Sequence, residues 1–192
     1  MTEIILASSS PFRRMILDKL SLPYSCVSPD IDESALANEI PTELVARLAT
    51  AKAAKVAETH TDALIIGSDQ VAVLGNEVLG KPGSHERAVE QLHKLSGQTV
   101  TFLTGLSLLN SRTGTCQTEV VPFRVFFRQL TAEMIEHYLR AETPYNCAGS
   151  FKSEALGIVL FDKLEGEDPN TLIGLPLIRL VRMLEKEAVT VL

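Results

Sequence analysis

The sequence predicts an α/β fold in which helices flank a mixed β-sheet. Three observations support this prediction. Short runs of strand-forming residues alternate with stretches of helical periodicity through the first half of the chain. Two long β runs lie on either side of a turn-forming segment in the second half. No repeat, low-complexity tract or linker rich in Pro and Ser divides the chain.

The length and composition allow a well-packed core. With 192 residues, of which 45% are hydrophobic, the chain can bury a core as one domain or as two closely packed lobes. We therefore expect residues 1–192 to form a single domain, with two lobes around a cleft.

The first half of the chain alternates strands with helices. Ser10 is a good N-cap and Pro11 a good first helical residue, so a helix should begin directly after the first strand and turn. Gly75 and Asn76 predict a hairpin turn. In order, the expected elements are strand 4–7, turn 8–10, helix 11–20, extended stretch 24–28, helix 42–58, strand 63–67, hairpin strands 71–74 and 77–79, and helix 84–95.

The second half begins with the two long β runs. They are separated by the sequence NSRTG, whose Asn, Ser and Gly residues favour turns. In order, the expected elements are strands 99–109 and 116–127, helix 131–141, a loop containing Gly149, a short strand 158–161 and a closing helix 176–186.

Charge and residue usage exclude several classes of protein. The chain has 18 Lys and Arg against 24 Asp and Glu, a formal charge of −6, which argues against a broad nucleic-acid or anionic-membrane surface. Charged residues such as Asp69 and Arg179 interrupt the apolar runs, so no membrane span is expected. The N-terminal charge order is the reverse of a secretory signal, and three widely spaced cysteines suggest reduced thiols. We expect a cytoplasmic protein with no nucleic-acid or membrane partner.

The start of the first predicted helix could hold an anion. Its free N–H groups attract negative charge, yet Arg13 and Arg14 in its first turn oppose the helix dipole. A bound phosphate would make use of both features. The alternative is that the two arginines merely pair with surface acids such as Asp18.

Three further charged positions stand out. Asp69 interrupts an apolar run, and burying an unpaired carboxylate is costly, so it should lie at a strand end, in a cleft or on a metal. The residues alone favour a turn between two strands, with Gly67 and Asp69 as turn residues. Lys52 lies within the apolar stripe of its helix, where it either extends to solvent or reaches a site. Lys81, between Gly80 and Pro82, reads by itself as a solvated turn residue.

An acidic loop completes the set of candidates. Asp30, Asp32 and Glu33 supply hard oxygen ligands that suit Mg²⁺ or Mn²⁺, although a solvated acidic loop explains them as well. Together with an anion-binding helix start and isolated lysines, they form the parts of a nucleotide-phosphate site. The sequence contains neither a P-loop nor a Rossmann fingerprint.

Six motifs, in order, resemble the Maf family of nucleoside triphosphate pyrophosphatases over about residues 4–185. They are ILASSSPFRR, DES at 32–34, the helix carrying Lys52, IIGSDQ at 65–70, GKP at 80–82 and GLPL at 174–177. The resemblance implies the Maf/Ham1 (ITPase-like) fold and hydrolysis of the bond between the α- and β-phosphates of a nucleotide. It also implies a divalent cation (Mg²⁺, Mn²⁺ or Co²⁺) as cofactor, and a homodimer is possible.

The resemblance also implies roles for individual residues. Asp69 would accept a proton from water, and Glu33 would support the metal or the water, so these two are the expected metal residues. The positions that match the family's phosphate contacts are Ser8, Arg13, Lys52 and Lys81, the two lysines being counted with the catalytic group.

Three positions resemble the bacterial subfamily that hydrolyses 7-methyl-GTP: Phe12, Gln70 and Glu154. The family's dTTP/UTP enzymes typically have Arg and Gln at the first and third of these. Phe12 could make a cation–π contact with the charged methylated base, and Glu154 could accept hydrogen bonds from its Watson–Crick edge. The subfamily pattern has Trp where this chain has Phe12. A dTTP/UTP pyrophosphatase and a non-catalytic nucleotide-binding regulator of cell division are the alternatives.

Overall fold

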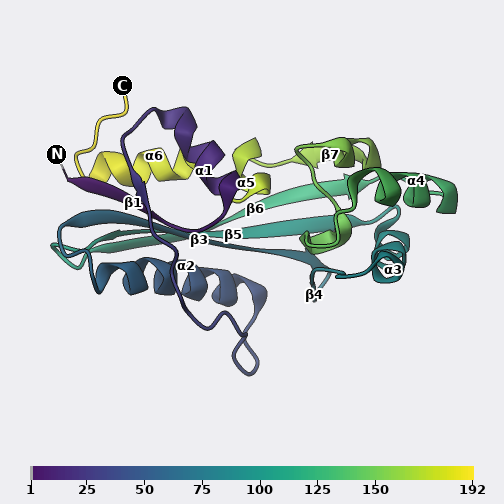
Figure 1. Cartoon of the computed structure of the whole chain (residues 1–192), viewed down its shortest axis with the longest axis horizontal. Coiled ribbons are helices and arrows are strands. Elements are labelled where there is room, and N and C mark those ends of the chain that lie inside the picture. The colour runs from purple at the N-terminus through teal and green to yellow at the C-terminus, as the bar shows by residue number, and fades with distance from the viewer. Residues whose placement is uncertain (1) are drawn as a thin grey trace. The chain divides into compact units, whose positions relative to one another are not determined.

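A computed structural model describes residues 2–192 (Figure 1). Within that range, seven strands form one sheet in the order β2-β1-β3-β5-β6-β7, and β4 pairs with β3. The strands are β1 Glu3–Ala7, β2 Ser25–Cys26, β3 Ala63–Leu74, β4 Glu77–Leu79, β5 Thr99–Asn110, β6 Cys116–Phe127 and β7 Phe161–Glu165. β1 pairs in parallel with β2 and β3, whereas β4 and β7 pair antiparallel with β3 and β6. The predicted mixed sheet is confirmed.

Capping side chains precede several of the helices. The side chains of Ser10, Ser84 and Thr131 each accept a hydrogen bond from a backbone N–H in the first turn of the helix that follows. The α-helices are α1 Pro11–Leu17, α2 Pro41–Ala57, α3 His85–Leu95, α4 Ala132–Glu142, α5 Pro169–Ile173 and α6 Leu177–Lys186. Short 3₁₀ helices are η1 Asp18–Leu20, η2 Ala148–Ser150 and η3 Leu156–Leu160. From residue 2 onward, no helix combines the length and apolar character needed to cross a membrane.

The chain divides into two compact units. The first unit contains the residues up to Gln70, Leu103–Val121 and Asp168–Leu192, and the second contains Val71–Phe102 and Pro122–Glu167. Two units agree with the two lobes expected from the sequence. The cleft and the single-domain organisation of residues 1–192 stay predictions.

In the first unit, the alternation of strand side chains separates two hydrophobic layers. Even-numbered residues of β1 and β3, such as Leu6 and Ile66, pack with α1 and α6. Odd-numbered residues, such as Ile5 and Ile65, pack with Ala53 and Val56 of α2. Figure 1 shows α2 on one face of these strands and α1, α5 and α6 on the other. Whether a β3 residue faces α2 or α5 therefore follows from its number.

Two glycines bring the α2 backbone directly onto the sheet. A Cβ atom on Gly67 of β3 would lie 2.0 Å from the carbonyl oxygen of Ala49, and one on Gly105 of β5 would lie 2.1 Å from that of Val45. Only glycine leaves room for a helix backbone at these positions. α2 is thereby fixed against the part of β3 that leads to Asp69.

The structure corrects several expectations about the elements. β3 continues without a break through the polar residues Ser68–Gln70, so the interpretation of Asp69 as part of a turn is wrong. Residues 158–161 do not form the expected strand. Leu156–Leu160 form the 3₁₀ helix η3, in which Gly157 lies against the backbone of Lys152, and β7 begins only at Phe161. α5 was not expected at all. The extended stretch 24–28 is reduced to Ser25–Cys26, and helix 11–20 ends as a 3₁₀ turn.

Candidate active site

A buried ammonium joins two carboxylates in the first unit. Lys52 Nζ lies 2.6 Å from Asp69 Oδ1 and 2.8 Å from Glu33 Oε1. The Lys52 and Asp69 side chains are 8% and 12% exposed, whereas the Glu33 side chain is 59% exposed. Three residues that the sequence places in a loop, a helix and a strand therefore meet at one point.

The local structure explains this meeting. Asp69 lies on the same face of β3 as Ile65 and Gly67, which is the face covered by α2. Lys52 belongs to the α2 stripe that packs on that face, and Ala49 and Ala53 beside it are too small to block its path. Of the two alternatives for Lys52, the structure supports the one in which it reaches a site. The ion pair also explains how β3 carries a carboxylate at a largely buried position.

The loop that carries Glu33 is anchored to α2. Arg47 Nη2 donates to the Ser34 carbonyl oxygen at 2.9 Å, and Arg47 also binds both carboxylate oxygens of Glu39, at 2.5 and 2.8 Å. The same Glu39 carboxylate accepts a hydrogen bond from the Leu36 backbone N–H at 2.9 Å. Glu39 and Arg47 thus fix both ends of the segment that follows Glu33.

This anchor predicts a pH effect on stability. The hydrogen bonds from Arg47 and from the Leu36 N–H lower the pKa of Glu39 from 4.5 to about 2. A lowered native pKa means that the stabilisation is complete above pH 4.5 and is lost as the pH falls to about 2. We expect Glu39→Gln to lower the urea midpoint of unfolding at pH 6 and to have a progressively smaller effect below pH 4. An effect of equal size at all pH values would contradict this role for the Glu39 carboxylate.

Arg13 is directed into the same neighbourhood. Its Nε donates to the Gly174 carbonyl oxygen at 2.9 Å, and the Ser68 hydroxyl donates to the same oxygen at 3.0 Å. Burial lowers the pKa of Arg13, and the nearby charges of Asp69 and Glu33 oppose that shift. Arginine remains charged in proteins, so Arg13 supplies a fixed cation beside the two carboxylates.

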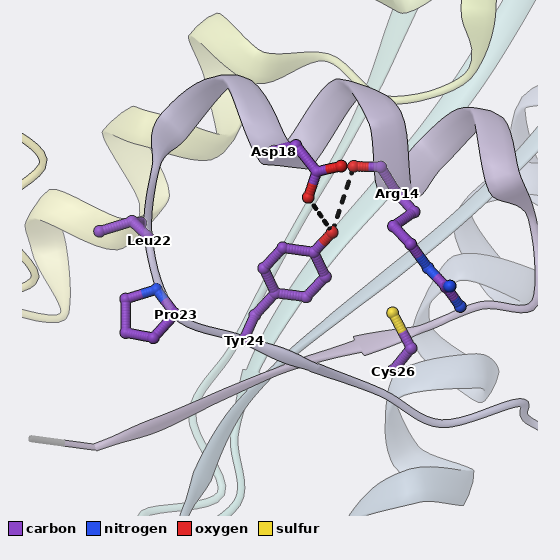
Figure 2. A pocket seen from close by; sticks show the side chains of 6 residues that line it. All are labelled: Arg14, Asp18, Leu22, Pro23, Tyr24 and Cys26. Carbon is purple, nitrogen blue, oxygen red and sulfur yellow. Dashed lines mark hydrogen bonds between the residues drawn. The ribbon is translucent and has the colours of Figure 1, made fainter.

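Arg14 faces a different part of the surface. Figure 2 shows the Arg14 side chain extending toward Cys26, and both residues line a cavity of about 500 Å³. In the same cavity, the Asp18 carboxylate accepts a hydrogen bond from the Tyr24 hydroxyl at 2.5 Å. Burial and this hydrogen bond raise the pKa of Tyr24 to about 12. From residue 2 onward, neither arginine forms an ion pair with Asp18, and Arg13 is held by Gly174 instead, so the surface-pairing interpretation is wrong for Arg13. Only Arg13 is held next to the Lys52 cluster.

Ser8 and Phe12 lie on either side of the α1 start. Ser8 is 6% exposed and its hydroxyl accepts a hydrogen bond from the Ser10 N–H at 3.1 Å, which shapes the turn before the helix. Phe12, in the first turn of α1, is 41% exposed and thus free to contact a ligand. Their roles as phosphate and base contacts stay predictions.

Gln70 is engaged with the protein itself. Being even-numbered, it points away from α2 and toward α5, where its Nε2 donates to Thr171 O at 2.7 Å and lies 3.3 Å from Leu172 O. It also donates to Thr104 Oγ1 at 2.8 Å. These contacts do not favour the expected role of Gln70 in selecting the base.

Lys81 and Glu154 belong to the second unit. Lys81 is exposed in the loop between β4 and α3, and the Gly83 N–H in that loop donates to the Tyr145 carbonyl oxygen at 2.9 Å. Glu154 is exposed before η3. Burial raises the pKa of the Cys147 thiol, Lys81 lowers it and Glu154 raises it further, so both residues act on one half-buried thiol. Their roles as phosphate and base contacts stay predictions.

Sequence reasoning missed α5 and its capping residue Asp168, although Gly174 at the end of this helix belongs to the GLPL motif. Asp168 is 1% exposed and caps α5 by accepting a hydrogen bond from the Asn170 N–H at 2.8 Å, and it also accepts one from the Ile178 N–H of α6 at 2.9 Å. Asp followed by Pro is a recognisable helix start and could have indicated α5. Five residues are too few to show helical periodicity, which is why the helix was missed.

Comparison with protein families decides the relationship. A profile described as "Maf-like protein" matches residues 3–187. The chain belongs to the Maf-like protein family. The resemblance stated from the six motifs is confirmed.

Named members of the family cover the whole chain. A 7-methyl-GTP pyrophosphatase of Pseudomonas syringae pv. tomato is 59% identical over 191 residues, which is 100% of both proteins. A protein of the same name from Alcanivorax borkumensis is 60% identical over 186 residues, 97% of this chain and 94% of that protein. Among solved structures, a HAM1 protein from Coxiella burnetii gives a TM-score of 0.46 at 18% identity, covering 66% of this chain and 73% of the other.

The residues of this Maf-like site suit a divalent cation that binds together with the phosphates of a nucleotide. In the part of the chain from Thr2 onward, no group of three or more His, Cys, Asp or Glu side chains could hold a metal alone. Glu33 and Asp69 nevertheless converge on one ammonium. Mg²⁺ is commonly held by one or two carboxylates, with substrate phosphates and water completing its shell. Of the acidic loop, only Glu33 reaches this point; Asp32 instead accepts a hydrogen bond from the Ser34 N–H at 2.9 Å.

Proposed function

We propose that the chain hydrolyses 7-methyl-GTP to 7-methyl-GMP and pyrophosphate. The observation that carries the proposal is the convergence of Glu33, Lys52 and Asp69 in a chain 59% identical over its full length to a 7-methyl-GTP pyrophosphatase. Nucleoside triphosphates are intracellular, so the proposal places the reaction in the cytoplasm.

The charges of the cluster suit a triphosphate that brings a cation. Arg13 and Lys52 supply two positive charges, and Glu33 and Asp69 supply two negative ones, so the four side chains have no net charge. A triphosphate needs further positive charge in order to approach two carboxylates. A bound divalent cation held by Glu33 and Asp69 would supply it and would stabilise charge developing on the phosphates.

The side chains then have separate tasks. Asp69 accepts a proton from the attacking water, whose oxygen forms a bond to the α-phosphorus as the bond to the bridging oxygen breaks and pyrophosphate leaves. Lys52 holds Asp69 and Glu33 in position from the buried side. Arg13 binds a phosphate oxygen, and Ser8 and Lys81 contribute further phosphate contacts by their match to the family motifs.

A substrate panel tests the proposal. The measurement is kcat/KM from pyrophosphate release with 7-methyl-GTP, GTP, dTTP and UTP, each in Mg²⁺, Mn²⁺ and Co²⁺ and with a chelator. We expect 7-methyl-GTP to be the best substrate and the chelator to abolish turnover. Faster turnover of dTTP or UTP would overturn the assigned substrate, and undiminished turnover in the chelator would overturn the need for a cation.

Base selection predicts a specific effect at Glu154. Its carboxylate is exposed, so it is available to accept hydrogen bonds from guanine and to complement the positive charge of the methylated base. Glu154→Gln is expected to lower the ratio of kcat/KM for 7-methyl-GTP over GTP by about tenfold, because the carboxylate charge favours the cationic methylated base while both bases share the same Watson–Crick edge. Glu133→Gln, another exposed glutamate of the second unit, is the control. An unchanged ratio in Glu154→Gln would remove Glu154 from the base site.

A further inference from the structure

The Gln70 amide ties β3 to α5 and is therefore not free to read a base. Its Nε2 group donates at 2.7 Å to the Thr171 carbonyl oxygen and at 2.8 Å to the Thr104 hydroxyl. Thr104 in turn donates at 3.1 Å to the same Thr171 carbonyl oxygen, so two polar side chains meet on one peptide group of α5. Thr104 and Thr171 are fully buried, which makes these bonds costly to leave unmade.

α5 depends on such contacts because it is too short to be stable alone. It has five residues, and an isolated helix of that length does not form. Asp168 caps its first turn, and Gln70 bonds its last. The helix ends at Gly174, whose left-handed φ of 119° ends the helix and sets the direction of its carbonyl group.

The Gly174 carbonyl is the contact that orients Arg13. The guanidinium Nε donates to it at 2.9 Å, and the Ser68 hydroxyl donates to it at 3.0 Å. A guanidinium fixed through Nε keeps its two terminal nitrogens for another anion. A continuous series of bonds therefore runs from Gln70 through α5 and the Gly174 carbonyl to Arg13.

We propose that Gln70 is a positioning residue that sets the orientation of Arg13 through α5 and the Gly174 carbonyl. This inference rests on the proposed function only in taking Arg13 as a phosphate ligand. Glutamine suits the task because its NH₂ group can donate to both the hydroxyl and the carbonyl. A glutamate of the same shape would place an oxygen against the Thr171 carbonyl oxygen, and a leucine would leave the carbonyl without this donor.

A double-mutant cycle on phosphate binding tests the inference without requiring turnover. The probe is tripolyphosphate with Mg²⁺, titrated calorimetrically into the wild type, Gln70→Leu, Arg13→Ala and the double variant. We expect Gln70→Leu to weaken binding about fivefold to tenfold in the wild-type background and to have no further effect once Arg13 is absent. An equal weakening in both backgrounds would overturn the inference, because Gln70 would then act independently of Arg13.

Substrate kinetics separate positioning from base reading. In Gln70→Leu we expect a higher KM for both 7-methyl-GTP and GTP, with the ratio of their kcat/KM values unchanged. A changed ratio would mean that Gln70 reads the base, and the inference would fail. Failure of the proposed function would appear separately, as lack of 7-methyl-GTP turnover by the wild type, while the tripolyphosphate titration would still report on Arg13.

A matched control and a second variant guard against a general loss of structure. Gln117 also bonds a helix through its amide, donating to the Met183 carbonyl oxygen of α6 at 3.1 Å, so Gln117→Leu should leave tripolyphosphate affinity unchanged. Gln70→Glu preserves the shape of the side chain and serves if Gln70→Leu does not fold. A loss of affinity in Gln117→Leu as large as in Gln70→Leu would overturn the inference.

Discussion

Replacing Asp69 with asparagine is expected to slow pyrophosphate release from 7-methyl-GTP about 10³-fold, within the range that general-base catalysis contributes. Asparagine has nearly the same shape but cannot take the proton from water. Lys52 would keep its contact with Glu33, 2.8 Å away, so the cluster should remain assembled. The loss should therefore fall on the rate of chemistry and not on the fold.

The measurement compares single-turnover rates with nucleotide affinity. The dissociation constant of 7-methyl-GTP for Asp69→Asn should lie within about threefold of the wild-type value. The substitution weakens the contact to the metal, but it also removes a negative charge that repels the phosphates. The matched control is Asp62→Asn, an exposed aspartate of the first unit that makes a long ion pair of 3.8 Å with Arg112. A variant at Asp69 that retained wild-type turnover would identify the chain as an enzyme with another base.

Replacing Gly67 with alanine is expected to destabilise the chain by about 3 kcal/mol, at the upper end of the usual cost of overpacking. The added Cβ would meet the Ala49 carbonyl oxygen at 2.0 Å and the Ala53 nitrogen at 3.0 Å. Both atoms belong to the α2 backbone, which cannot turn aside as a flexible side chain could. α2 must move outward, and Lys52 moves with it.

Thermal unfolding and turnover together report this displacement. We expect a lower melting temperature and, in the folded fraction, lower turnover, because the 2.6 Å contact between Lys52 and Asp69 would be disturbed. Gly80→Ala is the matched control for stability, since no atom lies within 4 Å of a Cβ at that position and its φ is not left-handed. A Gly67→Ala protein as stable as the wild type would show that α2 is not held by this contact.

Local patterns accounted for most of the fold. Ser10 with Pro11 predicted the start of α1, and the hairpin around Gly75 and Asn76 joins β3 to β4 as expected. Capping and turn residues act within a few positions of the chain, so they are legible in the sequence. The continuous apolar runs of β1 and β3 likewise predicted buried strands, and the structure shows their side chains packed into two hydrophobic layers.

The errors arise where distant residues decide the structure. Asp69 looked like a turn residue because its partner Lys52 lies 17 positions earlier, on a helix whose contact depends on Gly67. α5 escaped notice because Asp168 and Gln70, and not periodicity, hold it. The family resemblance grouped Arg13, Lys52 and Asp69 and included Gly174 in the GLPL motif, but it did not indicate that the Gly174 carbonyl orients Arg13.

The central claim is that the α-phosphate of the nucleotide is attacked beside Asp69. The most direct measurement is a crystal structure with Mn²⁺ and an α,β-methylene analogue of 7-methyl-GTP, in which anomalous scattering locates the metal. We predict Mn²⁺ bound by Asp69 and Glu33, with the α-phosphate within reach of Asp69 and a phosphate oxygen on Arg13. A triphosphate that contacts neither Asp69 nor Arg13 would contradict the account.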